Sequence, residues 1–145
     1  MADTLNAARV RVPCSTSNLG SGYDTIGLAL NRYLEASFEP GPTGLKIFRE
    51  GSLARAEYDD ADDLVARSFA SALRSMSLEV GGTLRLTSDI PIGKGLGSSA
   101  AAILAGSDLA LAAGGRGRDD AGVFGTAYEH EGHGDNLAPC LYGGL

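Results

Sequence analysis

A short glycine-rich segment, which joins a strand-like stretch to a helix-like stretch, constrains this chain more than any other feature. It reads Pro-Ile-Gly-Lys-Gly-Leu-Gly-Ser-Ser-Ala at positions 91–100, with glycine at every second position in its middle. Alternating glycines let the backbone turn tightly and approach a ligand, because no Cβ stands in the way. Ser98 and Ser99 follow where a helix should begin, and serine is a favoured N-cap residue.

This arrangement predicts a loop that binds phosphate. Free N–H groups and the positive end of the helix dipole meet at a helix N-terminus, which suits an anion. The P-loop pattern is excluded, because Lys94 is followed by glycine and Ser88 stands where the first glycine belongs. The spacing excludes the dinucleotide pattern G-x-G-x-x-G as well. The alternative is a glycine-rich turn that only caps a buried, alanine-rich helix.

The bulk properties indicate a soluble globular protein of one domain. The chain has 145 residues, and its net charge of −6 disfavours nucleic acid or an acidic membrane as a partner. No apolar run is long enough to span a bilayer and no signal peptide is visible, so we expect a cytoplasmic protein. Cys14 and Cys140 form neither a disulfide framework nor a metal-type pair, and we expect both as small, half-buried core residues.

Hydrophobic periodicity predicts both strands and helices. Alternation predicts strands at residues 8–12, 33–39, 45–49 and 82–87, with a turn at 40–44, and an antiparallel sheet is the natural arrangement. Helical spacing predicts a helix beginning near Leu64, a second over Ser98–Ala113 and a third over residues 118–131. Glycine pairs at 81–82 and 114–115 should end the first two helical regions.

Two charged segments are open to more than one interpretation. Residues 59–63 contain four aspartates, which we interpret as the solvated start of a helix rather than as a metal site, since carboxylates stabilise a helix N-terminus. Residues 129–136 gather ionisable side chains, but His130 and His133 lack the H-E-x-x-H spacing of a zinc site. A surface loop is the alternative for this second segment.

Three stretches together resemble the GHMP kinases, and among them the homoserine kinases. Residues 12–27 are similar to the N-terminal signature of that enzyme. Residues 95–100 resemble the ATP loop of the superfamily. Residues 131–136, followed by Ala-Pro and Gly-Gly, resemble homoserine kinases in particular. The three stretches occur in the family's order and span nearly the whole chain.

The resemblance implies an α+β fold of the ribosomal protein S5 domain 2-like type, with a mostly antiparallel sheet packed with helices. Residues 1–145 would be the N-terminal, ATP-binding domain. The C-terminal domain of the family, with its second glycine motif and substrate-binding arginines, would be missing from this chain. We therefore expect an N-terminal portion with little activity alone, whose exposed apolar surface would favour a homodimer.

The resemblance also implies roles for matching residues. The ATP phosphates would lie against Pro91, Gly93, Lys94, Gly95, Leu96, Gly97, Ser98, Ser99, Ala100 and Ala101. Glu131 would be the catalytic carboxylate that holds Mg²⁺, joined by the hydroxyl of Ser98. Homoserine would contact Asn18, Asp24, His133, Asp135 and Asn136. Asp24, the second catalytic residue, would act as a general base or orient the hydroxyl that is phosphorylated.

The activity implied is ATP-dependent phosphorylation of the hydroxyl of L-homoserine, a step of threonine biosynthesis. A glycine loop and one hard cation on a carboxylate supply what phosphoryl transfer needs. The alternatives are another GHMP kinase, acting on threonine, shikimate or mevalonate, and a non-catalytic fragment that binds nucleotide or oligomerises. Two residues depart from the family: Gly134 replaces a common proline, and Asp63 replaces an asparagine near the nucleotide base.

Overall fold

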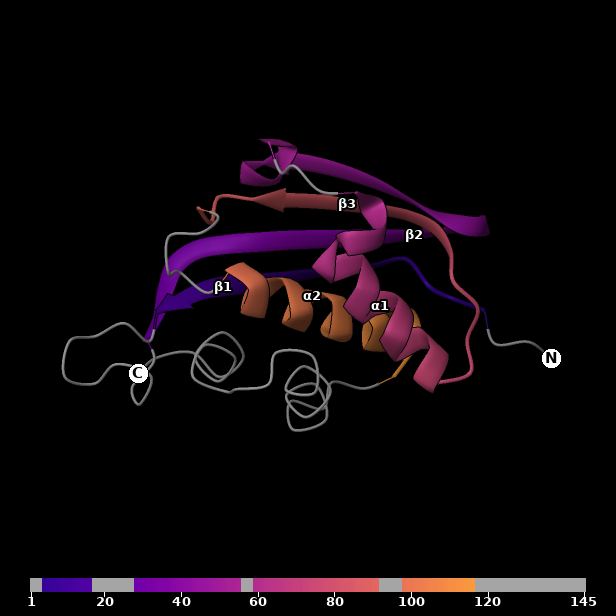
Figure 1. The fold of residues 1–145 in the computed structure, drawn as a ribbon. Coiled ribbons are helices and arrows are strands. Elements are labelled where there is room, and N and C mark those ends of the chain that lie inside the picture. The colour runs from indigo at the N-terminus through magenta and orange to yellow at the C-terminus, as the bar shows by residue number, and fades with distance from the viewer. Residues whose placement is uncertain (1–3, 17–27, 56–58, 92–97, 117–145) are drawn as a thin grey trace.

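The structure, a computed structural model, describes residues 4–16, 28–55, 59–91 and 98–116. The predicted 118–131 helix and Cys140 lie outside these residues. The described part forms an α+β arrangement in which helices cover one face of a sheet (Figure 1). Its elements are, in chain order, β1 (Ala8–Thr16), β2 (Leu28–Gly51), the short 3-10 helices η2 (Ser52–Arg55) and η3 (Asp60–Asp62), α1 (Leu64–Ser75), β3 (Gly81–Ser88) and α2 (Ser98–Ala113).

Strand β2 reverses direction near its middle, so it contributes two arms to the described sheet. Its first arm, residues 28–40, runs antiparallel to β3, since Leu34 pairs with Ser88 and Pro40 with Gly82. Its second arm, residues 45–51, runs parallel to β3, up to the pairing of Gly51 with Ser88. Strand β1 pairs antiparallel with the first arm. The order across the sheet is therefore β1, first arm, β3, second arm (Figure 1).

The predicted strands are confirmed, but the expectation of antiparallel pairing is wrong for one pair, because the second arm of β2 runs parallel to β3. The two arms of β2 do not pair side by side, because β3 lies between them. The glycine pair at the start of β3 explains how this strand fits between the two arms. A Cβ on Gly82 would lie 2.2 Å from the carbonyl oxygen of Glu39, and a Cβ on Gly81 would lie 2.7 Å from the carbonyl oxygen of Pro42. A strand that begins with two glycines can enter the bend of β2, where Gly44 takes a φ of +100°.

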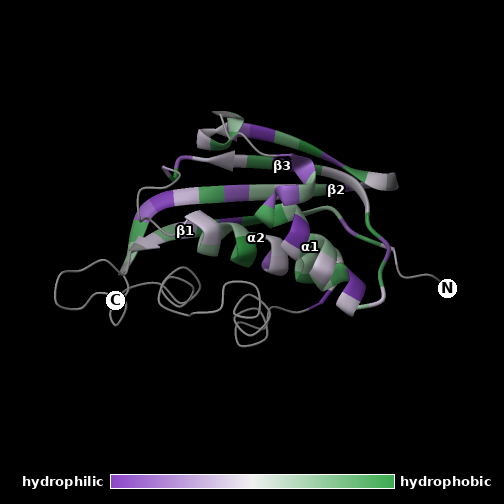
Figure 2. Cartoon of the chain, viewed as in Figure 1, coloured by the Kyte–Doolittle hydropathy of each residue, from purple (hydrophilic) through white to green (hydrophobic). Residues whose placement is uncertain are grey.

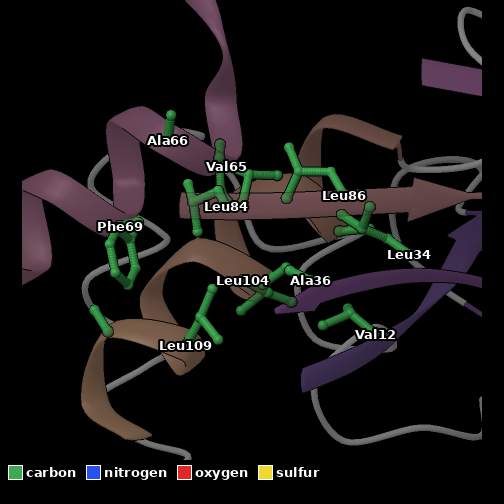
Figure 3. Packing of buried hydrophobic residues seen from close by; sticks show 14 of the residues in the cluster. Val12, Leu34, Ala36, Val65, Ala66, Phe69, Leu84, Leu86, Leu104 and Leu109 are labelled. Carbon is green, nitrogen blue, oxygen red and sulfur yellow. The ribbon is translucent and has the colours of Figure 1, made fainter. Parts of the chain in front are cut away.

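The core lies between the sheet and the helices (Figure 3). Helix α2 packs against β1, β2 and α1, and it is buried around most of its circumference. Small residues such as Ala100, Ala101 and Ala105 let it approach its neighbours closely, as the sequence suggested. Helix α1 is instead amphipathic, with Phe69 facing inward against Phe38 at a ring centroid distance of 4.9 Å. The charged residues of α1, Arg67 and Arg74, are exposed, and hydrophilic and hydrophobic residues alternate along the α1 ribbon (Figure 2).

The opposite face of the sheet is polar. Arg9 and Arg11 both pair with Glu35 there, and the Arg11 guanidinium lies 3.6 Å from the centroid of the Tyr33 ring. Cys14 points the other way and lies in the core, as predicted, but it is fully rather than half buried, and its burial raises the pKa of the thiol. No helix within the described ranges is long and apolar enough to cross a membrane.

Candidate functional site

A cavity of about 380 Å³ opens beside the first turn of α2. Six elements or their ends meet around it: the first arm of β2, η2, η3, the start of α1, the end of β3 and the start of α2. Most of its wall is apolar, formed by Leu34, Leu53, Leu64, Val65, Ile90 and Ala102. Ligand pockets in proteins are commonly apolar clefts of about 300–1,000 Å³, so this cavity has the size and lining of a binding site.

Polar groups line the cavity where the two helices begin. Ser98 and Ser99 are the first residues of α2, and both border the cavity half-buried. The six residues before them are the glycine-rich segment, which lies outside the described residues. Helix α2 begins at Ser98, as the sequence predicted, so the first N–H groups of the helix lie next to the cavity. The cavity thus has an apolar interior, and beside it lies a helix N-terminus that favours an anion.

Asp63 borders the cavity at the start of α1 and is almost completely buried. Its Oδ1 accepts a hydrogen bond of 2.9 Å from the backbone N–H of Ala66, which makes it the N-cap of α1. Its Oδ2 accepts a hydrogen bond of 2.8 Å from Nε of Arg49, on the second arm of β2. The acidic run does begin a helix, as interpreted, but the expectation that it is solvated is wrong for Asp63, which is buried and has donors to both of its oxygens.

Arg49 bridges two carboxylates on this wall. Its Nη2 also lies 2.8 Å from Oδ1 of the exposed Asp60. Burial alone would lower the pKa of Arg49, but the hydrogen bonds to Asp63 and Asp60 outweigh that effect and raise it. The guanidinium is therefore a permanent cation that neutralises the buried carboxylate and ties the second arm of β2 to α1.

Only part of the predicted site falls within the described residues. Ser98 and Ser99 line the cavity, and Pro91 is half-buried near it, whereas Ala100 and Ala101 are fully buried in the core. Outside the described residues lie Asn18, Asp24, Gly93, Lys94, Gly95, Leu96, Gly97, Glu131, His133, Asp135 and Asn136. Within the described ranges no three His, Cys, Asp or Glu side chains gather as a metal site.

Sequence reasoning missed the apolar walls of the cavity and the role of Arg49. Leu34, Leu53 and Ile90 come from distant parts of the chain, and nothing in their local pattern separates them from ordinary core residues. Arg49 lies within an alternating strand pattern, where a charged residue is expected to face solvent. The one signal available was the family difference at Asp63, which lies on the wall that Arg49 supports.

A comparison with protein families identifies the class of this chain. Residues 63–144, more than half of the chain, match the model of the GHMP kinases N terminal domain. The chain therefore belongs to the GHMP kinases, as its motifs suggested. The α+β fold agrees with this, since the mevalonate kinase of Methanococcus jannaschii, only 13% identical, superposes with a TM-score of 0.71 over 94% of this chain and 51% of its own.

The more similar relatives are homoserine kinases. The enzyme of Thermus thermophilus is 38% identical over 144 residues, and that of Streptomyces coelicolor is 41% identical over 143. These matches cover 97% and 96% of this chain but 47% and 46% of the relatives. The crystal structure of homoserine kinase from Cytophaga hutchinsonii matches 98% of this chain and 47% of its own, with 30% identity and a TM-score of 0.81. The chain thus spans about half the length of these relatives.

Proposed function

We propose that this chain binds ATP as the N-terminal half of a kinase that phosphorylates the hydroxyl of homoserine. The observation that carries the proposal is the apolar cavity at the N-terminus of α2, directly after the glycine-rich segment. A cavity of about 380 Å³ has room for a nucleobase and sugar. The phosphates would lie along residues 92–97 and the first N–H groups of α2, because a helix N-terminus favours an anion.

The remaining roles follow from the family resemblance and the residue types. Mg²⁺ would be held by Glu131 with the Ser98 hydroxyl, since carboxylate and hydroxyl oxygens suit this cation. Asp24 would face the homoserine hydroxyl, with Asn18, His133, Asp135 and Asn136 around the substrate. Bound Mg²⁺ would neutralise charge on the phosphates, while these side chains hold the hydroxyl in line with the γ-phosphorus. A cytoplasmic location, with access to ATP and free amino acids, belongs to the same proposal.

The homoserine kinases among the relatives favour homoserine over the other acceptors. Identity near 40% extends over almost the whole chain in those comparisons. The mevalonate kinase match rests on 13% identity and supports the fold alone. Another GHMP kinase remains the second candidate, because about half of the relatives' length has no counterpart in this chain.

Filling the cavity tests where the base binds. Ala102 lines the cavity, whereas Ala112 is an exposed residue on the same helix. Ala102→Phe should weaken binding of Mg²⁺–ATP by at least about tenfold, because the ring would occupy the space of the base. The same variant should bind Mg²⁺–tripolyphosphate nearly as well as the original chain. Ala112→Phe should leave both affinities unchanged.

Titration calorimetry with the two ligands measures these affinities directly. Equal loss of ATP and tripolyphosphate binding in Ala102→Phe would mean that the cavity is not a separate base site. Undiminished ATP binding in that variant would place the nucleotide elsewhere. Either result would contradict the proposal.

Turnover is a separate question from binding. We expect the 145-residue chain to show little or no transfer of phosphate from ATP to homoserine in a coupled assay, because about half of the relatives' length, in which the family resemblance places further substrate-binding arginines, has no counterpart in this chain. Turnover at a normal kinase rate by this chain would show that expectation to be wrong.

A further inference from the structure

The second arm of β2 forms an outer edge of the described sheet. Residues 45–51 pair with β3 on one side, and no described strand pairs with their other side. This arm is the uppermost strand in Figure 1, with β3 directly below it. An open edge offers unpaired N–H and C=O groups to another strand, and most proteins protect such edges with charges or bulges.

The outward-facing side chains of this edge have an unusual order. Lys46, Phe48 and Glu50 alternate along the arm and all are exposed. Phe48, at 49% exposure, is the exposed large hydrophobic residue of the described chain. The guanidinium of Arg85, from β3, lies 4.9 Å from the centroid of its ring. Neither Lys46 nor Glu50 forms an ion pair with any described residue.

This order is complementary to itself. If two copies of the arm pair antiparallel about a twofold axis at Phe48, that residue lies opposite its own counterpart. Lys46 of each copy then lies opposite Glu50 of the other, which gives two pairs of opposite charge. A shifted register can place like charges opposite one another, where they repel. The charges therefore favour the register centred on Phe48.

A groove lies on the other face of the same arm, where Leu45 and Ile47 point toward α1. It has a volume of about 570 Å³ and lies between the second arm of β2 and α1. Its lining includes apolar residues of both elements and charged residues of both signs, namely Asp60, Arg67 and Arg74. A six-residue edge alone is small for a stable interface, which typically buries about 1,200–2,000 Å². The groove adds adjoining area on the face from which the helices project.

We propose that residues 45–50 are a self-association site, through which a second copy of this chain extends the sheet antiparallel about Phe48. The occupant is a second copy because the charge pattern complements itself. The proposal does not depend on the assigned kinase activity, since the edge lies on β2 and α1 surfaces outside the cavity of the candidate site.

Charge-reversal variants test the pairing. Sedimentation velocity over a range of concentrations should show a monomer–dimer equilibrium for the original chain. Lys46→Glu and Glu50→Lys should each weaken self-association by about tenfold, because each places like charges opposite one another twice. An equimolar mixture of the two variants should recover a mixed dimer, since both carboxylates on the arm of one variant then lie opposite ammonium groups on the other. Glu39→Lys, an exposed charge reversal on the other arm, should leave the dimer unchanged.

The mixed dimer separates lost pairing from lost folding, because a variant that failed to fold would not recover in the mixture. The proposal is overturned by a monomeric original chain, which would mean that another segment or partner covers the edge. Undiminished dimers in both single variants would overturn it too, as would a mixture in which no mixed dimer forms.

Discussion

Asp63 illustrates how one side chain can serve both the fold and the candidate site. Its carboxylate caps α1, pairs with Arg49 across the sheet-to-helix junction and forms part of the cavity wall. Local sequence rules cover only the first of these roles, since an aspartate before a helix is a common N-cap. Both oxygens have donors from the chain itself, so Asp63 stabilises the wall of the cavity.

Removing Arg49 alone should lower the free energy of unfolding more than removing both partners of the Arg49–Asp63 ion pair. Arg49→Met leaves the Asp63 carboxylate buried without its partner, and we expect the free energy of unfolding to fall by about 3 kcal/mol. In the double variant Arg49→Met/Asp63→Asn the cap to Ala66 is retained without a buried charge, so the loss should be clearly smaller. Urea denaturation of the single and double variants measures this. A double variant less stable than Arg49→Met would contradict the assignment.

Ser77 carries backbone strain at the end of α1. Its φ of 59° lies in the left-handed region, while the Ser77 N–H bonds to the carbonyl of Arg74 and the Leu78 N–H to that of Leu73 in a Schellman pattern. Ser77→Gly should therefore raise the free energy of unfolding by about 0.5–1 kcal/mol. Ser75→Gly, two residues earlier and still helical, should lower it by about 0.5 kcal/mol. Thermal unfolding that shifts in the same direction for both variants would contradict this account.

At the scale of elements, the α1–α2 contact depends on one glycine. A Cβ on Gly106 would lie 1.9 Å from Oγ of Ser68 and 2.4 Å from the carbonyl oxygen of Val65. Gly106→Ala should therefore destabilise the chain by about 2–3 kcal/mol, although alanine favours helices. Gly114→Ala, where the nearest atoms lie at 3.2 Å, is the matched control and should change stability by less than about 1 kcal/mol. Chemical denaturation in which Gly106→Ala is neutral would mean that the helices lie farther apart.

Elements with strong local signals could be predicted from the sequence, and the order of strands across the sheet could not. Helix α2 begins and ends at the predicted residues because serines stand at its start and Gly114-Gly115 at its end, where Gly115 takes a φ of +70°. Alternation assigned the faces of β2 and β3 but says nothing about which strands are neighbours. The placement of β3 between the arms of β2 depends on glycines that local reasoning interpreted as a helix stop.

The candidate site shows the same division at the scale of the whole molecule. The helix start at Ser98 and Ser99 could be predicted, because glycine spacing and helix-capping serines are local features. The cavity could not, since its wall is assembled from residues far apart in sequence, such as Leu34, Leu53 and Ile90. Arg49 became recognisable only when the second arm of β2 was found beside the start of α1.

If the cavity holds a nucleotide base while the N-terminus of α2 holds the phosphates, a crystal structure of the chain with Mg²⁺ and a non-hydrolysable ATP analogue is the most direct measurement. We predict the base among Leu34, Leu64 and Ile90, with the phosphates next to Ser98 and Ser99. Density for the nucleotide at any other place, or an apolar cavity closed by protein side chains in the complex, would contradict this assignment.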